Sequence, residues 1–215
     1  MNYTNKQIAA ALDFAVLKPT TSRDQVTQAC ELAKANHFAS VCVRPCDVRQ
    51  ATSFGVRVST VIGFPHGGNA VPVKEFEAQH AIWNGADEID AVINYARLLD
   101  GSYDYVYEEI QQLRRAVPNN ILKIILETGC LAKYQTQLAC KMCAKAGVDY
   151  VKTSTGFNGP GASTVDIIRI REALQGSSVQ IKASGGINTN IEAVDYLNLG
   201  CTRIGSSKWM ELLNE

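Results

Sequence analysis

The chain has 215 residues, and a chain of this length buries on the order of 70% of its unfolded surface, so a sizeable core is available. Lysine plus arginine and aspartate plus glutamate both total 21, so no net charge draws the protein to nucleic acid or to a membrane surface. No apolar run approaches the ~18 residues that span a bilayer. We therefore expect a small-molecule function without a nucleic-acid or membrane partner.

From the amino terminus onward, short β-rich runs alternate with helical patterns over eight rounds. Gly85, Gly147 and Gly200 stand where predicted helices should stop. The predicted strands cover residues 11–17, 39–44, 56–63, 88–94, 122–128, 149–155, 179–184 and 202–205. The predicted helices cover residues 21–36, 46–53, 73–84, 103–117, 133–146, 164–174 and 191–199, followed by a closing helix after residue 208.

Eight βα units in 215 residues, without a linker or a low-complexity tract, predict an α/β fold, a compact (β/α)8 TIM barrel. We expect residues 1–215 to form one catalytic barrel domain. The alternative is a doubly wound open sheet. The count of eight and the missing Gly-x-Gly-x-x-Gly after the first strand favour the barrel.

The cysteines indicate a reducing compartment. There are seven, an odd number, scattered through predicted helices and strands, and the amino-terminal stretch lacks the charged-then-apolar form of a signal peptide. We therefore predict reduced thiols and a cytoplasmic location. Cys140 and Cys143 have the spacing of a redox or metal pair, but no second pair and no histidine lies near them, so a metal role is disfavoured.

Two predicted strands carry a lysine between apolar neighbours. Lys152 lies in the strand over 149–155, and Lys182 repeats the feature in the strand over 179–184. A lone lysine on a strand usually points to solvent or sits in an ion pair, because burying an unpaired ammonium is costly. The repetition on a second strand indicates instead that the two lysines serve one purpose.

Strand periodicity places both lysines inside the barrel. If Lys152 and Lys182 face inward, then Val151, Ile181 and Ala183 face the helices, which puts apolar residues where helices pack. The opposite register would reverse this arrangement.

The strand over 88–94 shows the same alternation, which leaves Asp90 on its inner side. Because alternate strands supply the layers of a barrel interior, Asp90, Lys152 and Lys182 can converge. The alternative is a purely structural ion triad, although such triads seldom stabilise a protein better than apolar packing.

Two neighbouring lysines suit Schiff-base chemistry. A lysine with a pKa near 10.4 is neutral in only about 0.04% of molecules at pH 7. A second cation on the adjacent strand, together with desolvation, lowers that pKa and raises the neutral fraction by about a hundredfold. The neutral amine can then attack a carbonyl, and a nearby carboxylate can move the protons of the reaction, directly or through water.

The loops after the last two strands indicate how the other end of the substrate binds. Residues 185–188 (GGIN) and 205–208 (GSSK) follow strands seven and eight, and backbone amides at these places commonly bind phosphate in barrels. The alternative is that the glycines only make turns. Because both loops fall at the expected end of the expected strands, we predict a phosphorylated aldehyde or sugar as substrate.

Segments spread along nearly the whole chain resemble deoxyribose-phosphate aldolase. The segments are DEIDAVIN (87–94), LKIILETG (122–129), VKTSTGF (151–157), IKASGGI (181–187) and RIGSS (203–207). The resemblance implies that Lys152 is the Schiff-base nucleophile. It further implies that Lys182 lowers the pKa of Lys152 and assists proton transfer, and that Asp90 donates and accepts protons together with a water.

The resemblance also implies the reaction and the remaining site residues. The reaction is reversible cleavage of 2-deoxy-D-ribose 5-phosphate to acetaldehyde and D-glyceraldehyde 3-phosphate, without a metal or organic cofactor. Cys42 matches a family cysteine that lines the site. The phosphate end would be lined by Gly156, Gly185, Gly186, Gly205, Ser206 and Ser207.

Two positions depart from the family pattern. The family usually has Asp-His-Thr near the first strand, whereas Phe14 and Ala15 follow Asp13 here, which puts polar contacts of that wall in doubt. Lys208 takes the place of a small hydroxyl residue, either as a further cation for phosphate or as an outward-pointing side chain.

Other functions compatible with the pattern are a class I aldolase with another donor and a non-catalytic barrel that binds a phosphorylated metabolite. A pure binder has no need of a desolvated lysine pair, which favours catalysis. Pairing of two copies into a homodimer through an outer helix suits the fold, but no stretch of the sequence identifies the face.

Overall fold

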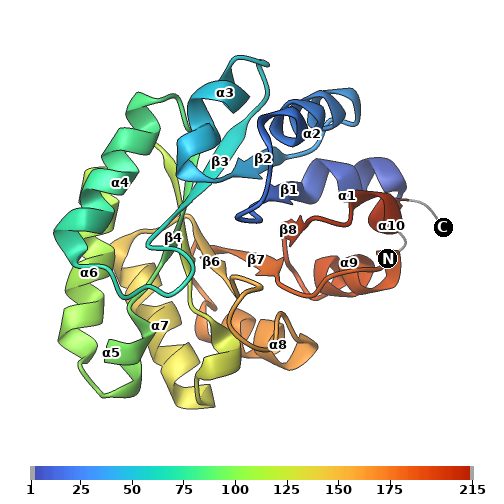
Figure 1. Cartoon of the computed structure of the whole chain (residues 1–215). Helices are drawn as coiled ribbons and strands as arrows, with labels where there is room; N and C mark the ends of the chain where they lie inside the picture. Colours follow the sequence, from blue (N-terminus) through green and yellow to red (C-terminus); the bar gives the residue numbers. More distant parts are fainter. Residues whose placement is uncertain (1–2, 214–215) are drawn as a thin grey trace.

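In the computed structural model, which describes residues 3–213, eight parallel strands close into a barrel in chain order. Each strand pairs with its neighbour in the chain, and β1 closes the ring by pairing with β8. Figure 1 shows the strands gathered at the centre and the helices arranged around them. The predicted (β/α)8 TIM barrel is therefore confirmed, and the doubly wound open sheet is wrong.

The strands are short and the helices vary in length. The strands are β1 (Leu12–Val16), β2 (Ser40–Val43), β3 (Val58–Ile62), β4 (Glu88–Val92), β5 (Ile121–Ile125), β6 (Tyr150–Lys152), β7 (Gln180–Ser184) and β8 (Arg203–Ser206). The helices are α1 (Asn5–Ala11), α2 (Arg23–Ala35), α3 (Val48–Thr52), α4 (Val71–Trp83), α5 (Tyr95–Leu99), α6 (Tyr103–Ala116), α7 (Lys133–Ala146), α8 (Thr164–Ala173), α9 (Asn190–Asn198) and α10 (Trp209–Leu213), with 3-10 turns at Pro45–Asp47 and Thr128–Cys130.

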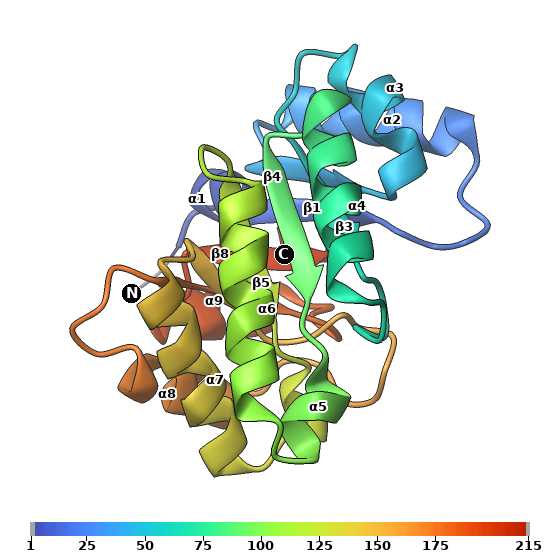
Figure 2. The same ribbon diagram turned by 90° about the vertical axis from the view of Figure 1, so that its left-hand side faces the viewer.

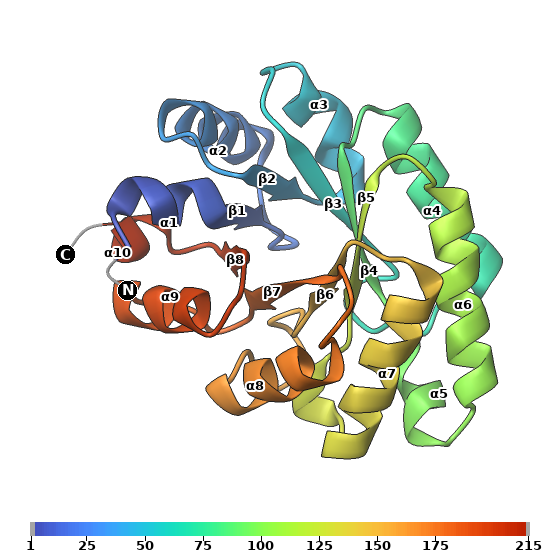
Figure 3. The same ribbon diagram turned by 180° about the vertical axis from the view of Figure 1, so that it is seen from behind.

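Two of these helices were not predicted. Helix α1 precedes the first strand and begins with a capping box in which Thr4 and Gln7 satisfy each other's backbone N–H groups. It buries Ile8 and lies beside α10, which in turn lies beside α9 (Figure 3). Helix α5 is a short turn of helix after β4, visible at the lower end of that strand in Figure 2. Both are too short to show a clear helical period in sequence.

Two predicted strands end three residues earlier than expected. The strands predicted over 122–128 and 149–155 leave the sheet after Ile125 and Lys152. The residues that follow remain buried: Leu126 is fully buried, and so are residues 153–155, or nearly so. Their β-branched and apolar character reflects burial at the rim of the barrel, which the sequence pattern cannot separate from strand pairing.

The side chains of each strand alternate between two environments, as the two-residue period of a strand predicts. Val151, Ile181 and Ala183 belong to the apolar core between the sheet and the helices. The inner face carries charges instead, and Lys152 stands directly opposite Lys182 in the β6–β7 register. The predicted inward register of both lysines is therefore confirmed.

A second buried ion pair lies in the helix layer. Lys74 of α4 and Glu109 of α6 are both fully buried, on two helices that run side by side in Figure 2. The Lys74 ammonium donates to Glu109 Oε1 at 2.5 Å and to the carbonyl oxygens of Gly67 and Val92 at 2.6 and 2.8 Å. The pair connects the loop after β3 and the end of β4 to the helices.

No helix between Tyr3 and Leu213 has both the length and the apolar content to cross a membrane.

Candidate active site

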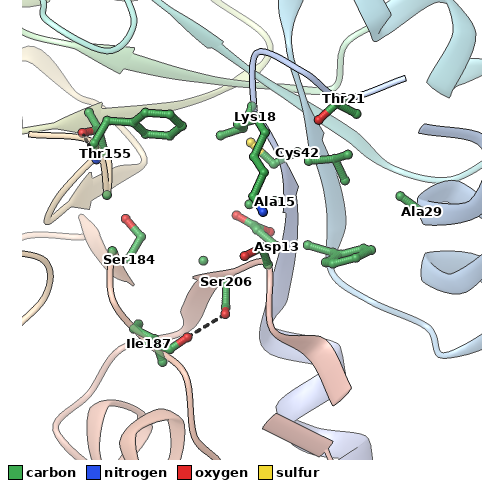
Figure 4. Close-up of a pocket in the computed structure, with 18 of the residues that line it drawn as sticks. Asp13, Ala15, Lys18, Thr21, Ala29, Cys42, Thr155, Ser184, Ile187 and Ser206 are labelled. Carbon is green, nitrogen blue, oxygen red and sulfur yellow. Dashed lines mark hydrogen bonds between the residues drawn. The ribbon is translucent and has the colours of Figure 1, made fainter. Parts of the chain in front are cut away.

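A cavity of about 570 Å³ opens beside the carboxyl ends of β1, β6, β7 and β8 (Figure 4). Its wall includes Lys152, Lys182 and Cys42. Every residue predicted for the phosphate end also lines this one cavity: Gly156, Gly185, Gly186, Gly205, Ser206 and Ser207. The sequence prediction therefore placed two lysines and the glycine loops around a common space.

Asp90 lies beneath the cavity wall, fully buried, and joins three lysines. Its Oδ1 atom accepts a hydrogen bond from Lys123 at 2.7 Å. Its Oδ2 atom accepts from Lys152 and from Lys182, each at 2.8 Å. The predicted convergence of Asp90, Lys152 and Lys182 is thus present in the structure.

The charged cluster is larger than the sequence analysis expected. Lys182 also donates to Asp13, and Arg203 bridges Asp13 and, at 2.7 Å, Glu88. Lys123 pairs with Glu88 Oε2 at 2.5 Å. Sequence reasoning did not assign a site role to these four additional members, Asp13, Glu88, Lys123 and Arg203. A usable signal was present, because Lys123 is also a cation between apolar strand residues.

The balance of charge in this cluster singles out Lys152. Lys123, Lys152, Lys182 and Arg203 supply four buried cations, whereas Asp13, Glu88 and Asp90 supply three carboxylates, one of which, Glu88, also pairs with the exposed Arg57. Each of the other three buried cations contacts two or more carboxylates, whereas Lys152 contacts one oxygen of Asp90 and shares it with Lys182. Lys152 is therefore the buried cation whose positive charge is least compensated by carboxylates.

The pKa shifts follow this balance. Burial lowers the pKa of Lys152, the neighbouring Lys182 lowers it further, and Asp90 opposes the shift without reversing it. Burial acts in the same direction on Lys182, but Asp13 and Asp90 raise the pKa of that lysine above its ordinary value. Burial alone would raise the pKa of Asp90, yet Lys123, Lys152 and Lys182 hold it well below the usual range. Lys152 is the lysine of this cluster most easily made neutral.

The glycines of the rim allow two loops to touch through their backbones. Gly185 has a φ of +90°, and a Cβ on it would lie 3.0 Å from the Cα of Gly161 and 3.3 Å from that of Gly156. A Cβ on Gly161 would lie 2.0 Å from the Gly185 carbonyl oxygen, which accepts the Ala162 N–H at 3.0 Å. The loops after β6 and β7 are therefore packed against each other through their backbones. These glycines are needed for that close contact and not only for the turns.

Gly205 and Ser206 have structural tasks beside the cavity. Gly205 belongs to β8, and a Cβ there would lie 2.8 Å from the Ser184 Cβ and 3.2 Å from the Lys182 Cε, so the glycine makes room for that lysine. The Ser206 hydroxyl donates to the Ile187 carbonyl at 2.7 Å, the dashed line in Figure 4. This bond ties β8 to the loop after β7.

The two departures from the family pattern have different outcomes. Phe14 and Ala15 line the cavity, where Phe14 also packs edge-on against Phe38 with ring centroids 5.7 Å apart. Positions 14 and 15 therefore present apolar side chains where the family usually has histidine and threonine. Lys208 is exposed and pairs with Glu211 at 3.2 Å, so of the two alternatives its side chain takes the outward one.

Cys140 and Cys143, which have the spacing of a redox or metal pair, are both buried. Burial raises the pKa of Cys140 to about 12 and that of Cys143 well above its ordinary value, which disfavours the thiolates that metal binding requires. Burial likewise raises the pKa of Cys42. Between residues 3 and 213, no group of three or more His, Cys, Asp or Glu side chains is placed to hold a metal ion.

The family model of the DeoC/LacD family aldolases matches residues 7–197 of the chain. The chain belongs to this family. Deoxyribose-phosphate aldolase of Caldicellulosiruptor saccharolyticus is 42% identical over 219 residues, which cover 99% of each chain. That of Halalkalibacterium halodurans is 42% identical over 216 residues, covering 98% of this chain and 96% of the relative.

Solved structures of family members have the same fold. A Coccidioides immitis protein, provisionally named a deoxyribose-phosphate aldolase, superposes with a TM-score of 0.96 at 38% identity, covering 99% of this chain and 86% of its own. The tetrameric deoxyribose phosphate aldolase of Aeropyrum pernix gives 0.90 at 29% identity, covering 98% and 91%. The resemblance found in the sequence is confirmed.

Proposed function

We propose that this DeoC/LacD-family aldolase reversibly cleaves 2-deoxy-D-ribose 5-phosphate to D-glyceraldehyde 3-phosphate and acetaldehyde through a Schiff base on Lys152. The observation that carries the proposal is the position of Lys152. It lines the cavity, has one shared carboxylate oxygen as its partner, and has a lowered pKa. Two relatives of nearly equal length carry the name of this activity.

The chemical steps assign a task to each of the three central residues. Neutral Lys152 attacks the C1 aldehyde, and loss of water from the carbinolamine gives the protonated Schiff base. Removal of the proton from the C3 hydroxyl breaks the C2–C3 bond and releases D-glyceraldehyde 3-phosphate, while the Schiff base accepts the electron pair as an enamine. Protonation at C2 and hydrolysis then release acetaldehyde and the free lysine.

Proton transfer in these steps falls to Asp90 and Lys182, with a water molecule. Lys182 lines the cavity, whereas Asp90 is fully buried behind it. One oxygen of Asp90 lies 2.8 Å from both amines, so this carboxylate can pass a proton between Lys152 and Lys182. Lys182 keeps its charge through Asp13 and Asp90, which suits it to donate a proton and to depress the pKa of its neighbour.

The phosphate end is proposed to lie against the glycine loops. Within residues 3–213, the backbone N–H groups of Gly156, Gly186 and Ser207 have no protein acceptor, although all three residues line the cavity. Free N–H groups on a concave rim form an anion-binding surface. Gly185 and Gly205 support this surface by allowing the close backbone contacts described above.

Borohydride trapping tests the proposal directly. The protein is incubated with 2-deoxyribose 5-phosphate and borohydride, digested, and searched by mass spectrometry for the reduced adduct. We expect the label on Lys152, and a Lys123→Met variant serves as a control that retains the nucleophile. Label on another lysine would contradict the assignment. Reaction with a different donor aldehyde or ketone only would indicate another class I aldolase, and stoichiometric binding without label would indicate a non-catalytic metabolite binder.

Further features of the proposal concern the whole protein. We infer that residues 1–215 form one catalytic domain, of which residues 1–2 and 214–215 lie outside the described part, and that the protein works in the cytoplasm without metal or organic cofactor. Activity that survives EDTA treatment would support the last point. The homodimer stays a prediction, to be checked by light scattering, and the Aeropyrum pernix relative is a tetramer.

A further inference from the structure

The cavity contains one cation that the proposed chemistry does not use. The charged residues on its wall are Asp13, Lys18, Lys152 and Lys182. All of these except Lys18 belong to the buried cluster and are paired within it. The Lys18 ammonium has no hydrogen-bond or ion-pair partner within the described residues 3–213. A free positive charge therefore borders the substrate space.

The backbone of Lys18 is held in place while its side chain is free. Its carbonyl oxygen accepts hydrogen bonds from the Thr21 N–H at 3.0 Å and from Arg44 Nη1 at 3.4 Å. Arg44 also binds the Pro19 and Thr21 carbonyls, at 3.0 and 2.9 Å, which fixes the start of the loop after β1. Figure 4 shows the Lys18 side chain extending from this loop into the cavity, toward the side where Asp13 and Ala15 lie.

Lys18 stands on a loop that adjoins the proposed phosphate end and lines the same cavity. Strands β1 and β8 are paired, with Phe14 opposite Ser206, so the loops that carry Lys18 and Ser207 leave the barrel at adjoining points of its rim. The loop residues 185–188 and 205–207 contain only glycine, isoleucine, asparagine and serine. Lys208 is engaged with Glu211 outside the cavity. The glycine loops thus offer amides but no charge.

We propose that Lys18 is the cation that binds the phosphate of the substrate and makes the enzyme selective for phosphorylated aldehydes. The inference rests on the proposed function. A phosphate bound by backbone amides alone keeps its negative charge unneutralised, and a charge-assisted hydrogen bond from an ammonium is about twice as strong as a neutral one. Lys18 supplies that contact from the loop after β1, beside the loop after β8.

The test compares a phosphorylated and an unphosphorylated substrate. In Lys18→Met, kcat/KM for 2-deoxyribose 5-phosphate should fall about 10- to 100-fold, chiefly through KM, as expected for the loss of a hydrogen bond to a charged group. The kcat/KM for 2-deoxyribose should stay unchanged. Inhibition by inorganic phosphate should weaken together with the loss on the phosphorylated substrate. Lys18→Arg should retain most of the preference. Lys208→Met, the matched control at the neighbouring loop, should behave like the unaltered protein.

Two results would overturn the inference without touching the proposed function. One is an equal loss on both substrates, which would mean that Lys18 contacts the sugar hydroxyls or the reacting centre. The other is an unchanged preference in Lys18→Met while borohydride still labels Lys152. Absence of both turnover and label in the unaltered protein would refute the proposed function, and this inference with it.

Discussion

Lys152 in the barrel interior and Lys74 in the helix layer are both buried, but their hydrogen-bond partners differ. Lys74, between α4 and α6, donates to three acceptors, one carboxylate oxygen and two carbonyls. An ammonium has three N–H donors, so every proton of Lys74 is engaged. Lys152 is nearly as buried, at 4% exposure, but has a single carboxylate oxygen that it shares with another lysine.

The difference shows that burial alone does not make a lysine reactive. Lys74 has a full set of acceptors and is fully buried, so its role is to stabilise the packing of helices against loops. Lys152 lacks acceptors, has cationic neighbours and lines a cavity. A shortage of acceptors at a surface that a carbonyl compound can reach is what converts a buried lysine into a nucleophile.

Removing the nucleophile should have the largest effect. Lys152→Met should lower kcat by at least about four orders of magnitude, because no other amine of the cluster has the same shortage of acceptors. Steady-state kinetics and borohydride trapping measure the loss. The variant should fold normally, since it removes an excess cation. Substantial residual label on Lys182 would show that the two lysines are less different than their contacts indicate.

Removing the shared carboxylate should have the next largest effect. Asp90→Asn leaves three lysines without their common partner and removes the proposed proton carrier, so kcat should fall about 10²- to 10⁴-fold. Glu88→Gln is the matched control, because Glu88 belongs to the same cluster but does not contact Lys152. A similar fall in both variants, measured per folded molecule, would assign Asp90 only a structural role.

The pH profile tests the influence of Lys182. The pKa of Lys152 is lowered, so the rate of Schiff-base formation should rise as the pH increases through that value. Lys182→Met removes a cation while Asp90 still favours the charged form of Lys152, so the pKa of Lys152 should rise. The rising part of the pH profile should then move to higher pH. The measurement is log kcat/KM against pH. An unmoved rising part, whatever the change in kcat, would contradict this electrostatic role.

The smallest effect on catalysis is expected in the helix layer. Lys74→Met leaves Glu109 buried without its counter-ion and should destabilise the protein by about 3–5 kcal/mol. Activity per folded molecule should remain that of the unaltered protein. The number of folded molecules is measured as the amount of Lys152 that borohydride traps. Urea unfolding measures the first quantity. A changed pH profile in this variant would show that the two buried sites are coupled.

The sequence predicted the fold and the centre of the site for physical reasons. Strand alternation has a period of two, so the apolar neighbours of Lys152 and Lys182 determine which way the lysines point. The charges around them were harder to assign. Asp13 meets Lys182 across the interior from a strand that is not its neighbour, and contacts of that kind depend on the stagger of the closed barrel. Lys123 could have been found, because it stands opposite Asp90 on the adjacent strand.

The close approach of Gly161 to Gly185 also decides where this protein can be redesigned. Because a single added methyl on Gly161 would collide with the Gly185 carbonyl, a broader aldehyde range cannot come from substitutions at these two glycines. The β1 wall has no such restriction, since Phe14 and Ala15 meet the cavity through their side chains. A mutant library that aims at new acceptors should therefore vary β1 and leave the glycines fixed.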